Sequence, residues 1–196
     1  MNIRDLKTKT LILSRGLPGS GKSFAVNELC KAFDQDETRN WLYHVCSSDH
    51  FFMEDGKYNF NINKLGQAHK QCQSVCDGVL SFNYDVVIID NTNISAKECR
   101  IYVEMGLKHK YNIEFLEPST PWAFDLDELE KRNQHNVPRH ALEKMLTRWV
   151  PNMTVEKALG HQQESTDMHK DEEAAHEAWE TKNNKVLAKD MNLYQQ

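Results

Sequence analysis

The stretch GLPGSGKS, residues 16–23, fits the pattern G-x-x-x-x-G-K-S/T. It follows a short apolar run at residues 10–14 and precedes a helix-compatible stretch at residues 24–33. This order of strand, loop and helix is the setting that a phosphate-binding loop requires. A glycine-rich turn before a helix can also be only a turn. The complete pattern with both flanks favours a loop that holds the phosphates of a nucleoside triphosphate.

Each residue type in this loop has a physical reason. Glycines let backbone N–H groups turn inward and approach a phosphate closely, and the following helix N-terminus adds partial positive charge. We expect Lys22 to reach the β- and γ-phosphates of ATP and the Ser23 hydroxyl to hold Mg²⁺. The predicted nucleotide-binding residues are Gly16, Pro18, Gly19, Ser20, Gly21, Lys22 and Ser23.

Length and charge divide the chain into two parts. The 196 residues fit one domain, which we place at residues 1–160, and a tail at residues 161–196 that is helical or partly disordered. The tail carries a net charge of −4 and the part before it carries −1. This balance excludes a broad basic sheath for nucleic acid but permits a local basic groove.

Cysteine usage and hydropathy point to the cytoplasm. The five cysteines, an odd number without a C-x-x-C pair, indicate reduced thiols in a reducing compartment. No stretch reaches the roughly 18 apolar residues of a membrane span, and the first ten residues lack the apolar segment of a signal peptide. We therefore expect an intracellular, soluble protein with no membrane partner.

Short apolar runs alternate with helix-length segments along the chain. Nearly continuous apolar runs are typical of strands covered on both faces, so the alternation predicts an α/β fold with a parallel sheet flanked by helices. The expected strands are 10–14, 41–46, 85–89 and 112–116, and the helices between them are 24–33, 62–82 and 96–109. Two helices at 125–134 and 138–150 predict a helical lid at about residues 123–150, and an amphipathic helix is expected at 171–194.

Ligands of a parallel sheet bind outside the carboxyl ends of its strands, where two acids stand. Asp90 ends the third run as a carboxylate that supports Mg²⁺ would, although an acid there is also a common turn residue. Asp49 follows the second run, where it is placed to take the proton from an attacking hydroxyl. A helix or turn cap is an equally good interpretation of Asp49.

Two arginines flank the tip of the expected lid. A mobile arginine can neutralise the negative charge that spreads over a phosphoryl group during transfer. Arg132 and Arg139 are candidates for that role, while a solvated helix face is the alternative interpretation of both.

Five segments in order resemble the P-loop 5′-hydroxyl polynucleotide kinases, in their kinase-only branch. The segments are RGLPGSGKS, SSDHFF, VVIIDNTN, EFLEPSTPW and KRNQHNVPR, spread over about residues 10–150. The resemblance implies transfer of the γ-phosphate of ATP to the 5′-hydroxyl end of DNA or RNA. It also implies Lys22 and Ser23 at the triphosphate and Mg²⁺, Asp49 as general base, and Arg132 or Arg139 as the lid arginine.

The chain departs from the phage enzyme that typifies this family. In that enzyme, an arginine three residues after the catalytic aspartate binds the phosphate of the acceptor. The corresponding residue in this chain is Phe52, and the loop of the expected lid is shorter than in the phage enzyme. No D-x-D-G-S/T motif is present, so 3′-phosphatase activity is not expected. The acceptor-binding candidates are therefore Phe51, Phe52, Asn91, Thr92, Asn93, Lys97 and Arg100.

Two alternative functions stay open. One is a small-molecule or nucleotide kinase with the same fold. This alternative stays open because Phe52 stands where the phage enzyme has the arginine that binds the acceptor phosphate. The other is an ATP-binding module without catalysis. The base candidate Asp49 argues against the second alternative, because a pure binder needs no proton acceptor at that place.

Overall fold

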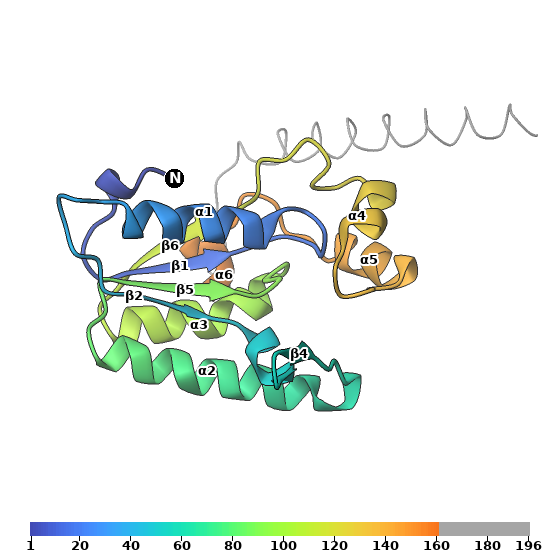
Figure 1. Cartoon of the computed structure of the whole chain (residues 1–196), viewed down its shortest axis with the longest axis horizontal. Helices are drawn as coiled ribbons and strands as arrows, with labels where there is room; N and C mark the ends of the chain where they lie inside the picture. Colours follow the sequence, from blue (N-terminus) through green and yellow to red (C-terminus); the bar gives the residue numbers. More distant parts are fainter. Residues whose placement is uncertain (161–196) are drawn as a thin grey trace, which may run out of the picture. The chain divides into compact units, whose positions relative to one another are not determined.

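The computed structural model describes residues 1–160, and the elements follow one another as Figure 1 shows. The sheet strands are β1 Thr10–Ser14, β2 Tyr43–Cys46, β5 Val86–Asp90 and β6 Asn112–Leu116, and a separate hairpin holds β3 Met53–Glu54 and β4 Lys57–Tyr58. The α-helices are α1 Lys22–Asp34, α2 Leu65–Ser81, α3 Ala96–Lys108, α4 Leu126–Arg132, α5 Arg139–Leu146 and α6 Val155–Leu159. Short 3₁₀ helices lie at η1 Ile3–Asp5, η2 Ser48–Phe52 and η3 Ile62–Lys64.

The main sheet is parallel throughout, with the strand order β2-β5-β1-β6. All five residues of β1 are buried, because helices cover both faces of the strand. That burial explains its unbroken apolar sequence, since a strand with one wet face would alternate. The predicted fold class, a parallel sheet flanked by helices, is confirmed.

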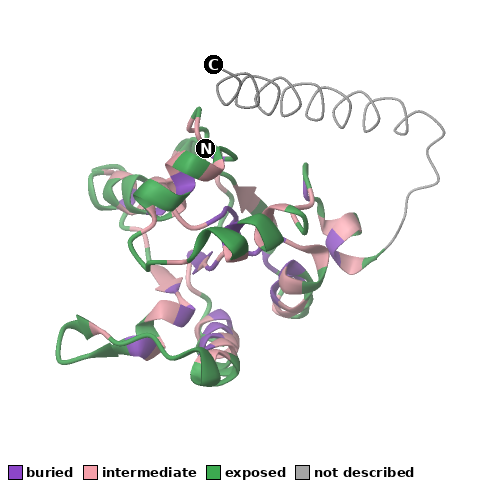
Figure 2. Cartoon of the chain, turned by 90° about the vertical axis from the view of Figure 1, so that its right-hand side faces the viewer, coloured by how far each residue is buried: buried purple, intermediate pink, exposed green. Residues whose placement is uncertain are grey.

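Alternate side chains of β1 enter different hydrophobic layers. Leu11 and Leu13 pack with residues of α2, α3 and α6 on one face, whereas Ile12 packs with Val26 and Phe33 of α1 on the other. This two-residue period is the geometry of a strand, and it gives the domain three layers. Figure 2 shows the buried residues gathered in the sheet and on the helix faces turned toward it.

The strand order sets which chain segments meet at the carboxyl edge of the sheet. Because β1 and β5 are neighbours, Ser14 lies in register with Asp90, and the loop that leaves β1 starts beside the end of β5. The lid helices α4 and α5 lie beyond the same edge (Figure 1). The predicted polar strand ends are thus brought to one side of the domain.

Two elements of the structure have no counterpart in the sequence interpretation. The hairpin of β3 and β4 turns at Asp55 and Gly56, which both adopt positive φ angles of 50° and 75°. Asp-Gly is a preferred pair for a two-residue hairpin turn of this kind, so the sequence carries a local signal for this hairpin. The other element is α6, which the structure packs against α3.

The expectations for the acidic tail, including a helix at 171–194, lie outside the described residues. Within residues 1–160, no helix has the length and apolar character needed to cross a bilayer.

A buried guanidinium ties the carboxyl edge together. The Arg15 side chain is 0 % exposed, and it donates hydrogen bonds to the backbone carbonyls of Asn93, at 2.9 Å, and Val150, at 2.8 Å. It also pairs with the carboxylate of Glu117 and lies 4.3 Å from the ring centroid of Trp149. One cation therefore joins β1 to the segments that follow β5, β6 and the lid.

We expect Arg15→Met to lower the free energy of unfolding by about 3 kcal/mol, because buried carbonyls lose their donor and Glu117 loses its partner. Urea unfolding followed by tryptophan fluorescence measures the change. Arg100→Met is the matched control, since Arg100 forms an exposed pair with Glu104 on α3, and it should change stability by less than about 0.5 kcal/mol. Equal stabilities for the two variants would contradict a structural role for Arg15.

Candidate active site

The loop at residues 16–23 keeps the shape that a phosphate-binding loop needs. Its first N–H group, on Gly16, donates to the carbonyl of Thr92 at 2.9 Å, which anchors the loop to the end of β5. At the other end, Gly21 is the N-cap of α1 with a φ of 90°, a left-handed conformation that side chains disfavour. A glycine is therefore required where the loop turns into the helix.

Helix α1 leaves its first turn available to a ligand. No side chain caps it, so its leading N–H groups point toward the loop without a capping oxygen. The hydroxyl oxygen of Ser20 is buried, and it has no hydrogen-bond partner within residues 1–160. Donors and a helix N-terminus of this kind fit the phosphates of a nucleotide.

Lys22, Ser23 and Asp90, which the sequence analysis places at the nucleotide and its metal, lie together at the end of β5. The ammonium of Lys22 forms an ion pair with the Asp90 carboxylate, and its Nζ lies 3.3 Å from the Ser23 hydroxyl oxygen. Both partners of the pair are only 12 % and 15 % exposed. The hydroxyl and the carboxylate are oxygen ligands of the kind that Mg²⁺ prefers, so this corner fits the metal of a bound nucleotide.

Asp49 stands at the start of η2, with a side chain that is 48 % exposed. Its Oδ1 accepts a hydrogen bond from the Tyr58 hydroxyl at 2.9 Å, and its Oδ2 lies 3.6 Å from Nε2 of His135. Burial and the Asp49 carboxylate raise the pKa of Tyr58 well above its ordinary value, so Tyr58 stays a donor. Tyr58 thus orients the carboxylate from one side, the His135 ring lies beside it, and one part of the carboxylate faces solvent.

Sequence reasoning missed Tyr58 and His135. Tyr58 comes from β4, and the Asp-Gly turn that builds this hairpin was the only signal for it. His135 comes from the lid loop, and its ring centroid lies 4.6 Å from that of Tyr58. No local pattern in the sequence indicates this meeting, because it depends on how the lid packs.

Three predicted acceptor-binding residues form internal contacts. Asn91 is buried, and its amide accepts from the N–H of Ser48 at 2.9 Å and donates to the Tyr102 hydroxyl at 3.1 Å. Asn93 is also buried and donates to the carbonyl of Ser14 at 2.7 Å, while Thr92 offers its carbonyl to the phosphate loop. The Asn91 and Asn93 side chains and the Thr92 carbonyl hold the strand ends in place, and a contact with an acceptor stays a prediction.

The other acceptor-binding candidates lie in two places. Lys97 and Arg100 are exposed on α3, where Arg100 pairs with Glu104. Phe51 and Phe52 end η2, three residues or fewer from Asp49, and their rings meet edge to face at 5.2 Å. Phe52 is only 3 % exposed, so its ring packs in the interior and offers little surface on which a ligand could stack.

The lid rests directly on the phosphate loop. A Cβ atom added to Gly19 would lie 2.5 Å from the carbonyl oxygen of Leu129 in α4, so any side chain there would displace the lid. The Trp122 indole N–H donates to the Gly19 carbonyl at 3.3 Å, and the guanidinium of Arg132 lies 4.1 Å from the Trp122 ring centroid. The Trp122 ring therefore lies between Arg132 and the phosphate loop, in contact with both.

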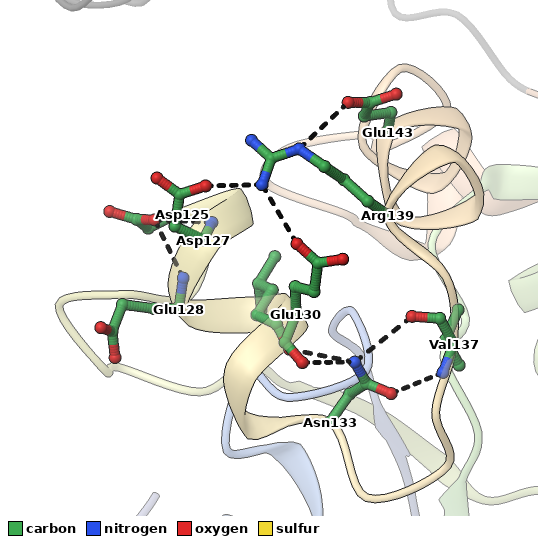
Figure 3. Close-up of polar contacts among 9 residues, drawn as sticks. Asp125, Asp127, Glu128, Glu130, Asn133, Val137, Arg139 and Glu143 are labelled. Atoms are coloured by element: carbon green, nitrogen blue, oxygen red, sulfur yellow. Dashed lines mark hydrogen bonds and ion pairs between the residues drawn. The ribbon is translucent and has the colours of Figure 1, made fainter.

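Arg139 is held between the two lid helices (Figure 3). Its guanidinium contacts Asp127 at 2.5 Å and Glu130 at 3.2 Å on α4, and Glu143 at 3.5 Å on α5. The hydrogen bond with Asp127 contributes most to a pKa raised above the ordinary arginine value. The contacts of Arg139 thus join the lid helices to each other.

The loop between the lid helices is closed by one amide. Asn133 accepts from the N–H of Val137 at 2.6 Å and donates to the carbonyl of the same residue at 3.3 Å (Figure 3). A further bond from Asn133 to the carbonyl of Glu130 ends α4. This closure fixes the short segment that carries His135 to Asp49.

Comparisons with known proteins agree with this fold. Residues 11–151 match the AAA_33 family, described as an AAA domain. The chain is 39% identical over 136 residues to human NEDD4-binding protein 2, covering 69% of this chain and 7% of that protein. It is 28% identical over 137 residues to mouse 2′,3′-cyclic-nucleotide 3′-phosphodiesterase, covering 70% of this chain and 30% of that enzyme.

The crystal structure of Chaetomium thermophilum Kti12 in complex with ADP-AlF3 shares the fold with a TM-score of 0.51 at 18% identity. The likeness covers 72% of this chain and 81% of that one. The present chain spans less than a third of either curated relative, so the likeness to them concerns this domain alone. With a matching P-loop kinase-like fold over residues 11–151, the chain belongs to the AAA_33 family of AAA domains.

Proposed function

We propose that this protein is an ATP-dependent kinase that transfers the γ-phosphate to the 5′-hydroxyl end of DNA or RNA. The observation that carries the proposal is the half-exposed carboxylate of Asp49, which stands at the same sheet edge as the phosphate loop, accepts a hydrogen bond from Tyr58 and lies 3.6 Å from the Nε2 atom of His135. A carboxylate held in this way suits the removal of a proton from an attacking hydroxyl.

The reaction follows from the charges at this edge. The acceptor oxygen forms a bond to the γ-phosphorus, the bond from that phosphorus to the β,γ-bridging oxygen breaks, and ADP leaves. Asp49 takes the proton of the acceptor hydroxyl. With a nucleotide bound, Lys22 would pair with the β- and γ-phosphate oxygens in place of Asp90, and Asp90 and Ser23 would hold Mg²⁺. The metal, when bound, neutralises charge on the phosphate oxygens.

Of the two lid arginines, Arg132 is the better candidate for the transferring phosphate. It lies over Trp122, which is itself hydrogen-bonded to the phosphate loop, and within residues 1–160 its one carboxylate partner is the half-buried Glu128 of the same helix. Arg139 would have to leave three carboxylates. Release of one ion pair costs less than release of three.

The nucleic-acid acceptor rests on two supports. The five ordered segments resemble the polynucleotide 5′-kinases over most of residues 10–150. A curated relative is also named for a reaction of cyclic nucleotides, which supports a nucleotide-like substrate class for this domain.

Asp49→Asn should lower phosphate transfer to a 5′-hydroxyl oligonucleotide by about a hundred- to ten-thousandfold, because only the proton acceptor is lost. The amide oxygen can still accept from Tyr58, so ATP affinity should stay unchanged. Transfer of labelled γ-phosphate and equilibrium ATP binding measure the two effects. Lys22→Ala is the contrasting variant, which should lose ATP binding itself.

The acceptor panel for this assay contains 5′-hydroxyl DNA, 5′-hydroxyl RNA, nucleosides and small alcohols. Transfer to nucleosides or alcohols alone would replace the proposal by a small-molecule kinase. Transfer at the wild-type rate by Asp49→Asn would remove Asp49 as the base.

Arg132→Ala should lower kcat by about a thousandfold, as expected for an arginine that stabilises the transferring phosphate. Arg139→Ala is the matched control in the same lid and should lower kcat by less than about tenfold, because its partners are lid carboxylates. Steady-state kinetics with saturating ATP distinguish the two variants. A larger loss for Arg139→Ala would reverse the assignment.

Tyr58→Phe should lower kcat by about tenfold while ATP affinity stays the same, because Asp49 loses a hydrogen bond that orients its charged carboxylate. Tyr43→Phe is the matched control, since Tyr43 donates to Asp34 at 2.8 Å, and Asp34 is the last residue of α1. We expect no change in kcat for the control. Equal kcat values for both variants would show that Tyr58 does not orient Asp49.

A further inference from the structure

A cavity of about 310 Å³ lies beside η2, outside the phosphate loop. Its aromatic wall consists of Phe51, Phe52 and Phe60, and its polar rim includes Asn59, Asn61 and Lys64. A volume of this size is at the lower end for small-molecule sites. We call this cavity the aromatic pocket.

The wall of the aromatic pocket is a packed set of rings with one open member. The ring of Phe52 lies 5.1 Å from that of Phe60 and meets Phe51 edge to face. Phe52 is buried, so it backs the wall, whereas Phe60 is 49 % exposed. An exposed ring supported from behind has a free face on which a flat ligand can stack.

One tyrosine connects the aromatic pocket with the proposed base. The Tyr58 ring lies nearly parallel to that of Phe60, at 14° and 6.4 Å between centroids. Its hydroxyl donates to Asp49. The side chain of Tyr58 therefore contacts both the wall of the pocket and the carboxylate of Asp49.

We propose that the aromatic pocket binds a nucleobase of the acceptor strand, an inference that rests on the proposed kinase function. Aromatic faces stack on any base, which makes such a wall tolerant of sequence. The Asn59 amide offers donors and an acceptor to base edges, and the Asn61 amide, whose oxygen accepts from the N–H of Asn63, adds N–H donors. The ammonium of the exposed Lys64 can meet a backbone phosphate.

The rim also contains the carboxylate of Glu54, which belongs to β3. A carboxylate on the rim repels a free phosphate but accepts hydrogen bonds from the exocyclic amino groups of bases. The combination of rings, amides and one acid favours a base over a phosphate as the occupant.

Phe60→Ala tests the stacking surface. It should raise the KM for a 5′-hydroxyl oligonucleotide by about tenfold or more, with kcat at saturating acceptor unchanged. Phe82→Ala is the matched control, because Phe82 is 77 % exposed at the end of α2 and does not line the pocket. An unchanged KM for Phe60→Ala would overturn the inference.

Acceptors that lack a single base identify the occupant. Three oligonucleotides, each abasic at the first, second or third position from the 5′ end, are compared with the intact strand. For one position, the wild-type KM should rise to the Phe60→Ala value, and Phe60→Ala itself should not respond to that change. Wild-type KM values that ignore all three abasic positions would overturn the base-binding role.

Direct binding separates this inference from the proposed function. Fluorescence anisotropy without ATP measures the affinity of each variant for the intact and abasic strands. If the wild type phosphorylates no oligonucleotide, the kinase proposal fails, and anisotropy alone decides about the pocket. Tighter binding of the intact strand by the wild type than by Phe60→Ala supports the pocket, and equal or absent binding overturns it.

Discussion

The carboxyl edge of the sheet depends on the buried guanidinium of Arg15. A charge without solvent contact is costly unless its donors are satisfied, and here backbone carbonyls, Glu117 and Trp149 surround it. Its carbonyl partners belong to the segments after β5 and after the lid. Arg15 directly precedes Gly16, the first residue of the phosphate loop. The same side chain therefore holds the start of this loop and the segments that follow β5, β6 and the lid helices.

The proposed catalytic groups are supplied by segments far apart in sequence, and the segments that carry Asp49 and His135 are held by asparagine side chains. Asn91 positions η2 by accepting from Ser48, which places Asp49 at the edge. Asn133 closes the lid loop and so presents His135. The site is therefore built from amide-to-backbone bonds as much as from the charged residues they orient.

The sheet and the phosphate loop were predictable because both leave local signals. Buried parallel strands read as apolar runs, and the loop at 16–23 has a fixed spacing, so β1 was predicted with its observed bounds. The contacts of the lid arginines were not predictable. An arginine near a helix end looks the same in the sequence whether its guanidinium lies over Trp122, as in Arg132, or pairs with Asp127, as in Arg139. The positions of Tyr58 and His135 beside Asp49 depend on tertiary packing, which leaves no periodic pattern in the sequence.

The contact between Gly19 and Leu129 has a thermodynamic consequence. Because the lid lies on the backbone of the loop that receives the triphosphate, any change in the loop on nucleotide entry changes the surface on which α4 rests. Two events that share one surface are linked, and linkage is reciprocal. A ligand that binds more tightly when α4 rests on this loop must then change nucleotide affinity by the same factor, so the contact between Gly19 and Leu129 couples the lid to the nucleotide site.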